Sequence, residues 1–133
     1  MCHCVRGFSK SHPIRQTRDM SETATNFISA LKFNSAGLIP VVVQDAHSKA
    51  VLMMAWMNSD AIVQTFQTSA ATYWSRSRNE LWVKGETSGN TQQVVSIAYD
   101  CDADTILLTV IQHGAACHTG DYTCFDKNQI ELP

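Results

Sequence analysis

The sequence predicts an α+β fold in which a mostly antiparallel sheet and two short helices form one compact domain, residues 21–133. The chain has 133 residues, which is enough for one domain with a substantial hydrophobic core. Roughly six β-rich runs are joined by polar or glycine-containing turns, whereas two segments have the apolar spacing of a helix. Many short strands beside two helices indicate a mostly antiparallel α+β architecture.

Residues 1–20 precede this domain and show neither helical nor strand periodicity. They are basic and contain a glycine and a proline, so we expect a poorly ordered N-terminal arm, with Met20 as an alternative start. The triplet Cys2-His3-Cys4 has ligand-type side chains, but consecutive residues rarely converge on one metal. We therefore expect no metal site in the arm.

The first predicted helix spans residues 21–33. Its apolar residues recur at i, i+3, i+4 and i+7, which places them on one helical face: Ala24, Phe27, Ile28 and Leu31. Ser21 or Thr23 is expected to cap the start of this helix. The second predicted helix, residues 61–68, follows the Asn-Ser-Asp start signal at 58–60.

The remaining regular elements are predicted strands. Residues 38–46 and 50–57 are two β-rich runs joined by a polar tripeptide, which predicts a hairpin. Four further strands are expected, at residues 71–78, 81–87, 92–100 and 105–112. Residues 113–125 contain too many small and polar side chains for regular structure.

Composition indicates a globular cytoplasmic protein that binds neither nucleic acid nor membranes. Apolar residues make up 44% of the chain and charged residues 17%, which is ordinary for a globular domain. The formal net charge is −2, with +4 in residues 1–18 and −6 in the rest, so a nucleic-acid partner is not expected. The chain has no apolar run of about 20 residues for a membrane span and no N-terminal secretory signal.

Five cysteines without a secretory signal argue against a disulfide framework and favour metal binding or catalysis. Cys117 and Cys124 are seven residues apart, which is not the spacing of a structural zinc knuckle. With Cys101 they offer three thiolates, and a zinc ion with three protein ligands keeps one position open for catalytic water. Buried cysteines that act as small hydrophobic residues are the alternative. His118, next to Cys117, is a fourth ligand, a general acid or base, or an exposed side chain.

Residues 100–104 read Asp-Cys-Asp-Ala-Asp and place three carboxylates in five positions. If this stretch continues the preceding strand, Asp100, Asp102 and Asp104 share one face and the cysteine between them lies on the other. The carboxylates suit a hard cation such as Mg²⁺, whereas the thiolate suits zinc. A calcium loop of the EF-hand type is excluded, because its required Gly and Glu positions hold other residues. An acidic turn at the end of the strand is the alternative.

Residues 74–90 combine cations, hydroxyls and glycines in a pattern suited to anion binding. In an extended strand Arg76, Arg78 and Trp74 project from one face, and two guanidinium groups there suit bidentate phosphate recognition. Residues 84–90 add a cation, hydroxyls and two glycines that let backbone N–H groups approach an anion. A solvated hairpin with a polar turn is the alternative. The candidate substrate-binding residues are Trp74, Ser75, Arg76, Ser77, Arg78, Lys84, Gly85, Glu86, Thr87, Ser88, Gly89 and Asn90.

Four motifs in a fixed order carry a family resemblance: WSRSR at 74–78, LWVKGETSGN at 81–90, DCDAD at 100–104, and ACHTG at 116–120 followed by a cysteine. Together they closely resemble phosphoribosyl-AMP cyclohydrolase of histidine biosynthesis in its stand-alone form. The apolar blocks GLIPVVVQDA and VLMMAWMN resemble the N-terminal part of that family. The resemblance extends over residues 36–125.

This resemblance implies a hydrolase that uses zinc and Mg²⁺ to break the N1–C6 bond of the adenine in 1-(5-phosphoribosyl)-AMP, giving the aminoimidazole carboxamide ProFAR. It also implies an intertwined homodimer with the site at the subunit interface. Carried over by position, the zinc ligands are Cys117, Cys124 and Cys101 of the partner subunit, and the Mg²⁺ ligands are Asp100, Asp102 and Asp104. His118 is the candidate for the proton transfers. Residues 74–78 and 84–90 are expected to hold the two phosphates of this small nucleotide.

Three positions depart from the family pattern. Ala115 stands where the family usually has Pro, Val83 where a polar or basic residue is common, and Asn90 where His is frequent. None of them is a proposed metal ligand. The competing function is a zinc-stabilised module that binds nucleotides or RNA through its arginines and Trp74, and the acidity of residues 19–133 argues against it.

Overall fold

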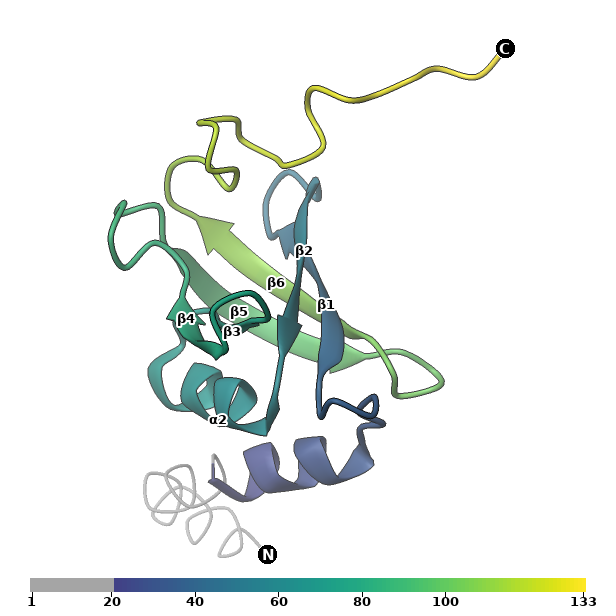
Figure 1. Cartoon of the computed structure of the whole chain (residues 1–133), viewed down its shortest axis with the longest axis vertical. Helices are drawn as coiled ribbons and strands as arrows, with labels where there is room; N and C mark the ends of the chain where they lie inside the picture. The colour runs from purple at the N-terminus through teal and green to yellow at the C-terminus, as the bar shows by residue number, and fades with distance from the viewer. Residues whose placement is uncertain (1–20) are drawn as a thin grey trace, which may run out of the picture.

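The computed structural model describes residues 21–133 and has the predicted α+β architecture (Figure 1). One helix covers residues 21–30 and a second, α2, covers Ser59–Thr68. The six strands are β1 (Ile39–Asp45), β2 (Val51–Met57), β3 (Thr72–Ser75), β4 (Glu80–Val83), β5 (Gln92–Tyr99) and β6 (Ile106–Gln112). The predicted arm and its Cys-His-Cys triplet lie outside the described residues.

The strands form a four-stranded sheet in the order β2-β1-β6-β5 and a two-stranded sheet of β3 and β4. The pairs β1–β2, β3–β4 and β5–β6 are antiparallel, and only the central pair β1–β6 is parallel among the described strands. The mostly antiparallel prediction is therefore confirmed. The hairpin of 38–46 and 50–57 is confirmed as well, with Ile39 paired to Met57.

One face of the four-stranded sheet carries the hydrophobic core. Burial alternates along β1, so that Ile39, Val41 and Val43 are completely buried, as expected for a strand with one covered face. Side chains of α2 and β3 pack into the same cluster, and Tyr73 is its largest fully buried member. The opposite face is more open: Met54 is 45% exposed and Leu107 is 39% exposed.

The predicted helix caps have different outcomes. Asn58 caps α2 as predicted, because its side-chain oxygen accepts a hydrogen bond of 2.8 Å from the Ala61 N–H. The predicted caps of the first helix are wrong, since Ser21 and Thr23 both lie within its helical residues. This helix packs through Phe27, whose ring lies 5.3 Å from that of Tyr99.

Three predicted strands end earlier than the sequence indicates. β3 ends at Ser75 because residues 76–79 turn back, and the Asn79 N–H donates to the Ser75 carbonyl at 2.8 Å. β4 ends at Val83, before a turn that covers residues 84–90.

β5 ends at Tyr99, so residues 100–104 do not continue the strand, and the alternative of an acidic turn at the end of the strand is confirmed. These residues form the β5–β6 turn, which is closed by a hydrogen bond of 3.0 Å from the Asp100 N–H to the Thr105 carbonyl. Ala103 has a φ of 61° there, which a strand does not allow. The alternation of Asp100, Asp102 and Asp104 against Cys101 therefore has no strand to support it.

No helix within residues 21–133 has both the length and the apolar character needed to cross a membrane.

Candidate active site

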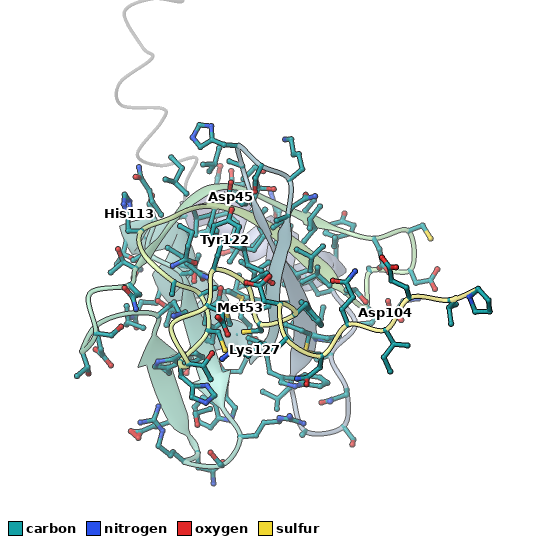
Figure 2. All side chains as sticks on the ribbon, turned by 90° about the horizontal axis from the view of Figure 1, so that it is seen from above. Asp45, Met53, Asp104, His113, Tyr122 and Lys127 are labelled. Atoms are coloured by element: carbon teal, nitrogen blue, oxygen red, sulfur yellow. The ribbon has the colours of Figure 1, made fainter. Side chains whose placement is uncertain are left out.

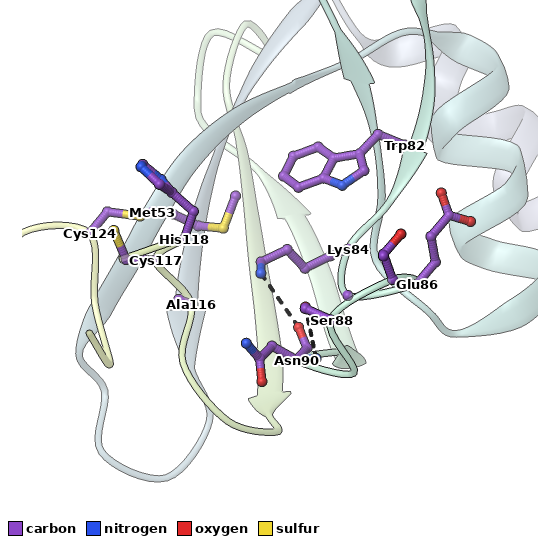
Figure 3. A pocket seen from close by; sticks show the side chains of 12 residues that line it. Met53, Trp82, Lys84, Glu86, Ser88, Asn90, Ala116, Cys117, His118 and Cys124 are labelled. Carbon is purple, nitrogen blue, oxygen red and sulfur yellow. Dashed lines mark hydrogen bonds between the residues drawn. The ribbon is translucent and has the colours of Figure 1, made fainter. Parts of the chain in front are cut away.

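A cleft of about 360 Å³ lies between the β4–β5 loop and the loop that follows β6 (Figure 3). It joins segments that are about thirty residues apart in the chain, because β5 and β6 are paired and both loops leave the same end of that hairpin. The residues that line it are Met53, Trp82, Lys84, Gly85, Glu86, Thr87, Ser88, Asn90, Ala116, Cys117, His118 and Cys124.

Backbone hydrogen bonds place Cys117 and Cys124 beside each other. The Cys117 N–H donates to the Asp121 carbonyl at 3.1 Å, which folds residues 117–121 into a tight turn. The Cys124 N–H donates to the Leu52 carbonyl at 2.7 Å and so attaches the end of the loop to β2. Both thiols are free, and they lie close enough for each to shift the pKa of the other. Cys117 and Cys124 are therefore neighbours because of the conformation of the loop after β6, and their spacing in the sequence alone does not predict it.

The two thiols differ in acidity. The Thr119 hydroxyl donates to the Cys117 sulfur at 3.1 Å and, with the Thr119 N–H, lowers the pKa of Cys117 below its ordinary value. Burial raises the pKa of Cys124, and the neighbouring Cys117 raises it further. The pair therefore combines one thiol whose pKa is lowered with one whose pKa is raised. A bound cation would favour the thiolate form of both.

The β4–β5 loop brings a buried cation to the opposite wall of the cleft. Lys84 is only 7% exposed, and its ammonium group donates to the Asn90 carbonyl at 3.4 Å. Burial lowers the pKa of Lys84. Hydroxyl side chains of Thr87 and Ser88 line the cleft nearby. A lysine, two hydroxyls and a tight backbone turn are suited to an anionic ligand.

The two loops touch through Asn90. A Cβ atom on Gly114 would overlap the Asn90 side chain, and a Cβ atom on Gly85 would overlap the Asn90 backbone. The position of the cysteine loop therefore depends on the shape of the loop that carries Lys84.

Nine of the nineteen predicted site residues meet in this cleft. His118 and the cysteine pair lie on one wall, and all residues from 84 to 90 except Gly89 lie on the other. Gly89 has a positive φ of 83° and open space around it, so its contribution is to the turn itself.

The arginine motif lies in adjacent hollows and not in the cleft. Trp74, Ser75, Ser77 and Arg78 line a second hollow of about 360 Å³, which shares Met53 and Trp82 with the cleft. Arg76 and Trp74 line a third hollow, and the Arg76 guanidinium lies 4.8 Å from the centre of the Trp56 ring. The prediction that Arg76 and Arg78 share one strand face is wrong, because the chain turns after Ser75.

Cys101 and the three aspartates lie far from the cysteine pair. β6 separates the turn at 100–105 from the loop after Gln112, and seven residues at ~3.3 Å each span roughly 20 Å. Figure 2 shows the same separation, with Asp104 and His113 on opposite sides of the molecule. Within residues 21–133 no group of three or more His, Cys, Asp or Glu side chains is arranged to hold a metal ion.

Sequence reasoning missed Met53, Trp82 and Ala116 as lining residues. Trp82 had a usable signal, because it lies two residues before Lys84 and so shares its face on an extended segment. Met53 had none, since all seven residues of β2 are apolar and nothing in the pattern selects one of them.

A sequence model of the family described as phosphoribosyl-AMP cyclohydrolase matches residues 53–126, which include both walls of the cleft and the β5–β6 turn. The chain belongs to the phosphoribosyl-AMP cyclohydrolase family. The resemblance read from the four motifs is thereby confirmed. Membership of an enzyme family favours catalysis over a nucleotide-binding module.

Several relatives named phosphoribosyl-AMP cyclohydrolase align over most of their length. The protein of Corynebacterium diphtheriae is 59% identical over 100 residues, which are 75% of this chain and 85% of the relative. That of Chlorobium chlorochromatii is 52% identical over 110 residues, 83% of this chain and 80% of the relative. That of Thermobifida fusca is 58% identical over 100 residues, 75% of this chain and 86% of the relative.

We predict that Gly85→Ala destabilises the fold more than Gly89→Ala. Both glycines have φ above 80°, so each substitution costs about 1–2 kcal/mol of backbone strain. Only at Gly85 would the new methyl group also overlap the Asn90 backbone, which adds about 1–3 kcal/mol. Urea unfolding of the two variants measures the difference, and equal midpoints would contradict the close packing of Gly85 against Asn90 within the β4–β5 loop.

We predict that Thr119→Val shifts the alkylation of Cys117 to higher pH. The lowered pKa keeps Cys117 as a reactive thiolate at lower pH, so loss of the hydrogen bond from Thr119 must raise the pH at which it reacts. The measurement is the rate of iodoacetamide modification of the metal-free protein against pH, followed by mass spectrometry. Thr119→Ser keeps the hydroxyl and serves as the control, with an unchanged profile.

Proposed function

We propose that this protein is a zinc- and magnesium-dependent hydrolase that opens the adenine ring of 1-(5-phosphoribosyl)-AMP at the N1–C6 bond to give ProFAR in histidine biosynthesis. One observation carries the proposal. In a single cleft, a free cysteine pair and a histidine lie on one wall, and a buried lysine in a turn suited to anions lies on the other. A nucleotide phosphate held at the lysine would place the base near the thiols. The family of the chain and the names of its relatives agree with this chemistry.

The cysteine pair fits a zinc site that is incomplete in one chain. Two neighbouring thiols, one of them with a lowered pKa, are soft ligands of the kind that zinc prefers. Cys101 would be the third ligand, and it is free and exposed in the β5–β6 turn. Because the turn lies at the far end of β6, Cys101 can complete the site only from a partner subunit. Bound there, zinc would supply Lewis acidity and make a water molecule more acidic.

The open face of the four-stranded sheet is suited to a second copy of the chain. Val42 is paired with Met54 on one side and Leu107 on the other, so these apolar side chains form a row across three strands. A twofold axis through this face would reverse the direction of the sheet in the partner. Each β5–β6 turn would then lie near the partner's cysteine pair, and two identical sites would form.

The substrate carries two phosphates, and two neighbouring hollows each offer groups that bind anions. Lys84, Thr87 and Ser88 would hold one phosphate in the cleft. Ser75, Ser77 and Arg78 would hold the other in the second hollow, with Trp82 between the two. Arg76, which faces a third hollow beside Trp74, would act on the edge of this surface.

The reaction adds the oxygen of one water molecule to C6 of the purine and breaks the C6–N1 bond. C6 becomes a carboxamide that keeps its amino group, N1 gains one proton of the water while it stays bonded to ribose, and the second proton is released because the N1-ribosyl adenine ring starts as a cation. His118 lines the cleft next to Cys117, and an imidazole can accept the proton of the water and deliver it to N1 near neutral pH. Lys84 would hold the phosphate and so fix the position of C6.

The second cation of the proposal is Mg²⁺ at the aspartate turn. Asp100, Asp102 and Asp104 offer hard oxygen ligands within five residues. The turn also carries Cys101, so a dimer that brings the thiol to the cysteine pair would bring these carboxylates to the same cleft. There they would balance the charge of the substrate phosphates through the cation.

A direct assay tests the activity. Purified protein with Zn²⁺, Mg²⁺ and 1-(5-phosphoribosyl)-AMP is expected to produce the ring-opened product, followed by absorbance. Cys101→Ser, Cys117→Ser and Cys124→Ser should each abolish turnover and bound zinc, because each removes a ligand. The double variant Cys2→Ser, Cys4→Ser is the control and should keep both. Full activity of a zinc-free Cys124→Ser protein would refute the proposed role of the metal.

Mixed dimers test whether the site is shared between subunits. Cys101→Ser and Cys117→Ser chains should both be inactive alone, yet regain about a quarter of wild-type activity after they are unfolded together and refolded. About half of the dimers are then mixed, and each mixed dimer has one intact site. Cys117→Ser mixed with Cys124→Ser is the matched control and should stay inactive, because both defects fall on the same half of the site. Recovery in both mixtures, or in neither, would rule out a shared site.

A further inference from the structure

Three polar side chains, those of buried Tyr73 and Gln92 and of half-buried Gln112, form a chain of hydrogen bonds behind the cysteine loop. The Tyr73 hydroxyl donates to Gln92 Oε1 at 2.6 Å, and Gln92 Nε2 donates to Gln112 Oε1 at 2.8 Å. Tyr73 is completely buried and Gln92 is 1% exposed. The network links β3, β5 and β6, and no buried side-chain polar atom within the described residues lacks a partner. A buried network of this kind is stabilising only while every member is satisfied.

Only one assignment of donors and acceptors satisfies this network. Gln112 Nε2 lies within 3.4 Å of three carbonyl oxygens, those of Thr91, His113 and Ala115, so this end of the amide must be its NH₂ group. Its oxygen then faces Gln92, which must present its own NH₂ group and turn its oxygen to Tyr73. Tyr73 is left as the donor, and burial raises its pKa so that the hydroxyl keeps its proton.

The far end of the network holds the backbone that leads to Cys117. Gln112 Nε2 donates to the carbonyls of His113 and Ala115, and Ala115 is two residues before Cys117. Among the backbone hydrogen bonds of residues 21–133 outside helices and strands, none is donated to either carbonyl. Gln92 Nε2 also contacts the Met53 sulfur at 3.4 Å, and Met53 lines the cleft. The amide of Gln112 therefore supplies the donors that this irregular segment needs.

We infer that Gln92 and Gln112 are positioning residues for the metal site: their hydrogen-bond relay from Tyr73 fixes the path of residues 113–116 and thereby the separation of the Cys117 and Cys124 thiols. The inference rests on the proposed function in that it takes the thiol pair as a zinc site. It makes the separation of the two thiols depend on core side chains that touch neither metal nor substrate. Gln92 acts through Gln112, because none of its side-chain hydrogen bonds within the described chain reaches residues 113–125.

The test uses Gln92→Met, Gln112→Met and the double variant, because methionine keeps the length of glutamine and removes its polar groups. Gln93→Met is the matched control, since Gln93 is adjacent and exposed and makes no side-chain hydrogen bond in the described chain. Zinc affinity is measured by competition with a chromophoric chelator, at a temperature where thermal unfolding curves show all variants to be folded. Each single substitution is expected to weaken zinc binding by about 10–100-fold, as for loss of other groups that orient metal ligands.

The double variant separates positioning from a general loss of stability. Because Gln92 acts through Gln112, Gln92→Met should add little to the loss of zinc affinity once Gln112→Met is present. Folded variants that bind zinc as tightly as the wild type, or a loss of equal size in Gln93→Met, would overturn the inference. So would two independent, additive losses.

A metal-free measurement keeps this inference separate from the proposed function. Phenylarsine oxide bridges two thiols only when they are close, so its reaction with the Cys117–Cys124 pair reports their separation without zinc or catalysis. A Cys2→Ser, Cys4→Ser, Cys101→Ser background removes the other thiols. Slower capture in Gln112→Met, with Gln93→Met unchanged, supports the relay even if the wild type binds no zinc. Equal capture rates in all variants would refute it.

Discussion

The parallel pairing of β6 with β1 at the centre of the sheet is the constraint on which the rest of the structure depends. It fixes the direction of β6, and β6 in turn separates the aspartate turn from the cysteine loop by its full length. Thiols that the proposed zinc site requires together are thereby held at opposite ends of one rigid strand. No loop movement within a chain would bring Cys101 to Cys117. In the proposed zinc site the three thiols would therefore come from two subunits, and the open apolar face of the sheet is the surface on which those subunits would meet.

The irregular loop after β6 is ordered by its neighbours and not by a regular element of its own. Cys124 is attached to the edge strand β2 through the Leu52 carbonyl, and the start of the loop rests on the amide of Gln112. Asn90 packs against Gly114 without room for another atom. Three separate parts of the domain therefore set the distance between two sulfurs. Loops that carry chemistry are commonly held on rigid elements in this way.

Charge in the cleft follows from burial on one wall and hydrogen bonding on the other. Lys84 is buried on the wall opposite the thiols, so its ammonium group loses solvation and its pKa is lowered, while hydrogen bonds from Thr119 lower the pKa of Cys117. An anionic ligand near Lys84 would balance the charge of its ammonium group, and a cation near the thiols would balance the charge of the thiolates. In the proposed function, the nucleotide phosphate and the metal would therefore lie at opposite walls of this cleft. Met53 and Trp82 form the apolar surface between this cleft and the hollow that holds Arg78.

Local patterns were sufficient for the fold class, the β1–β2 hairpin, the Asn58 cap of α2 and the residues of the cleft that come in compact motifs, such as Lys84 and Cys117. Period-two alternation and capping act between residues close in sequence, so the sequence by itself determined these features. Only the tertiary structure decided where strands end: turns closed by backbone hydrogen bonds separate Arg76 from Arg78 and turn residues 100–104 out of the sheet. It alone also paired Cys117 with Cys124 and brought Met53 to them, because those contacts come from the packing of β2 against a distant loop. No local pattern records that packing.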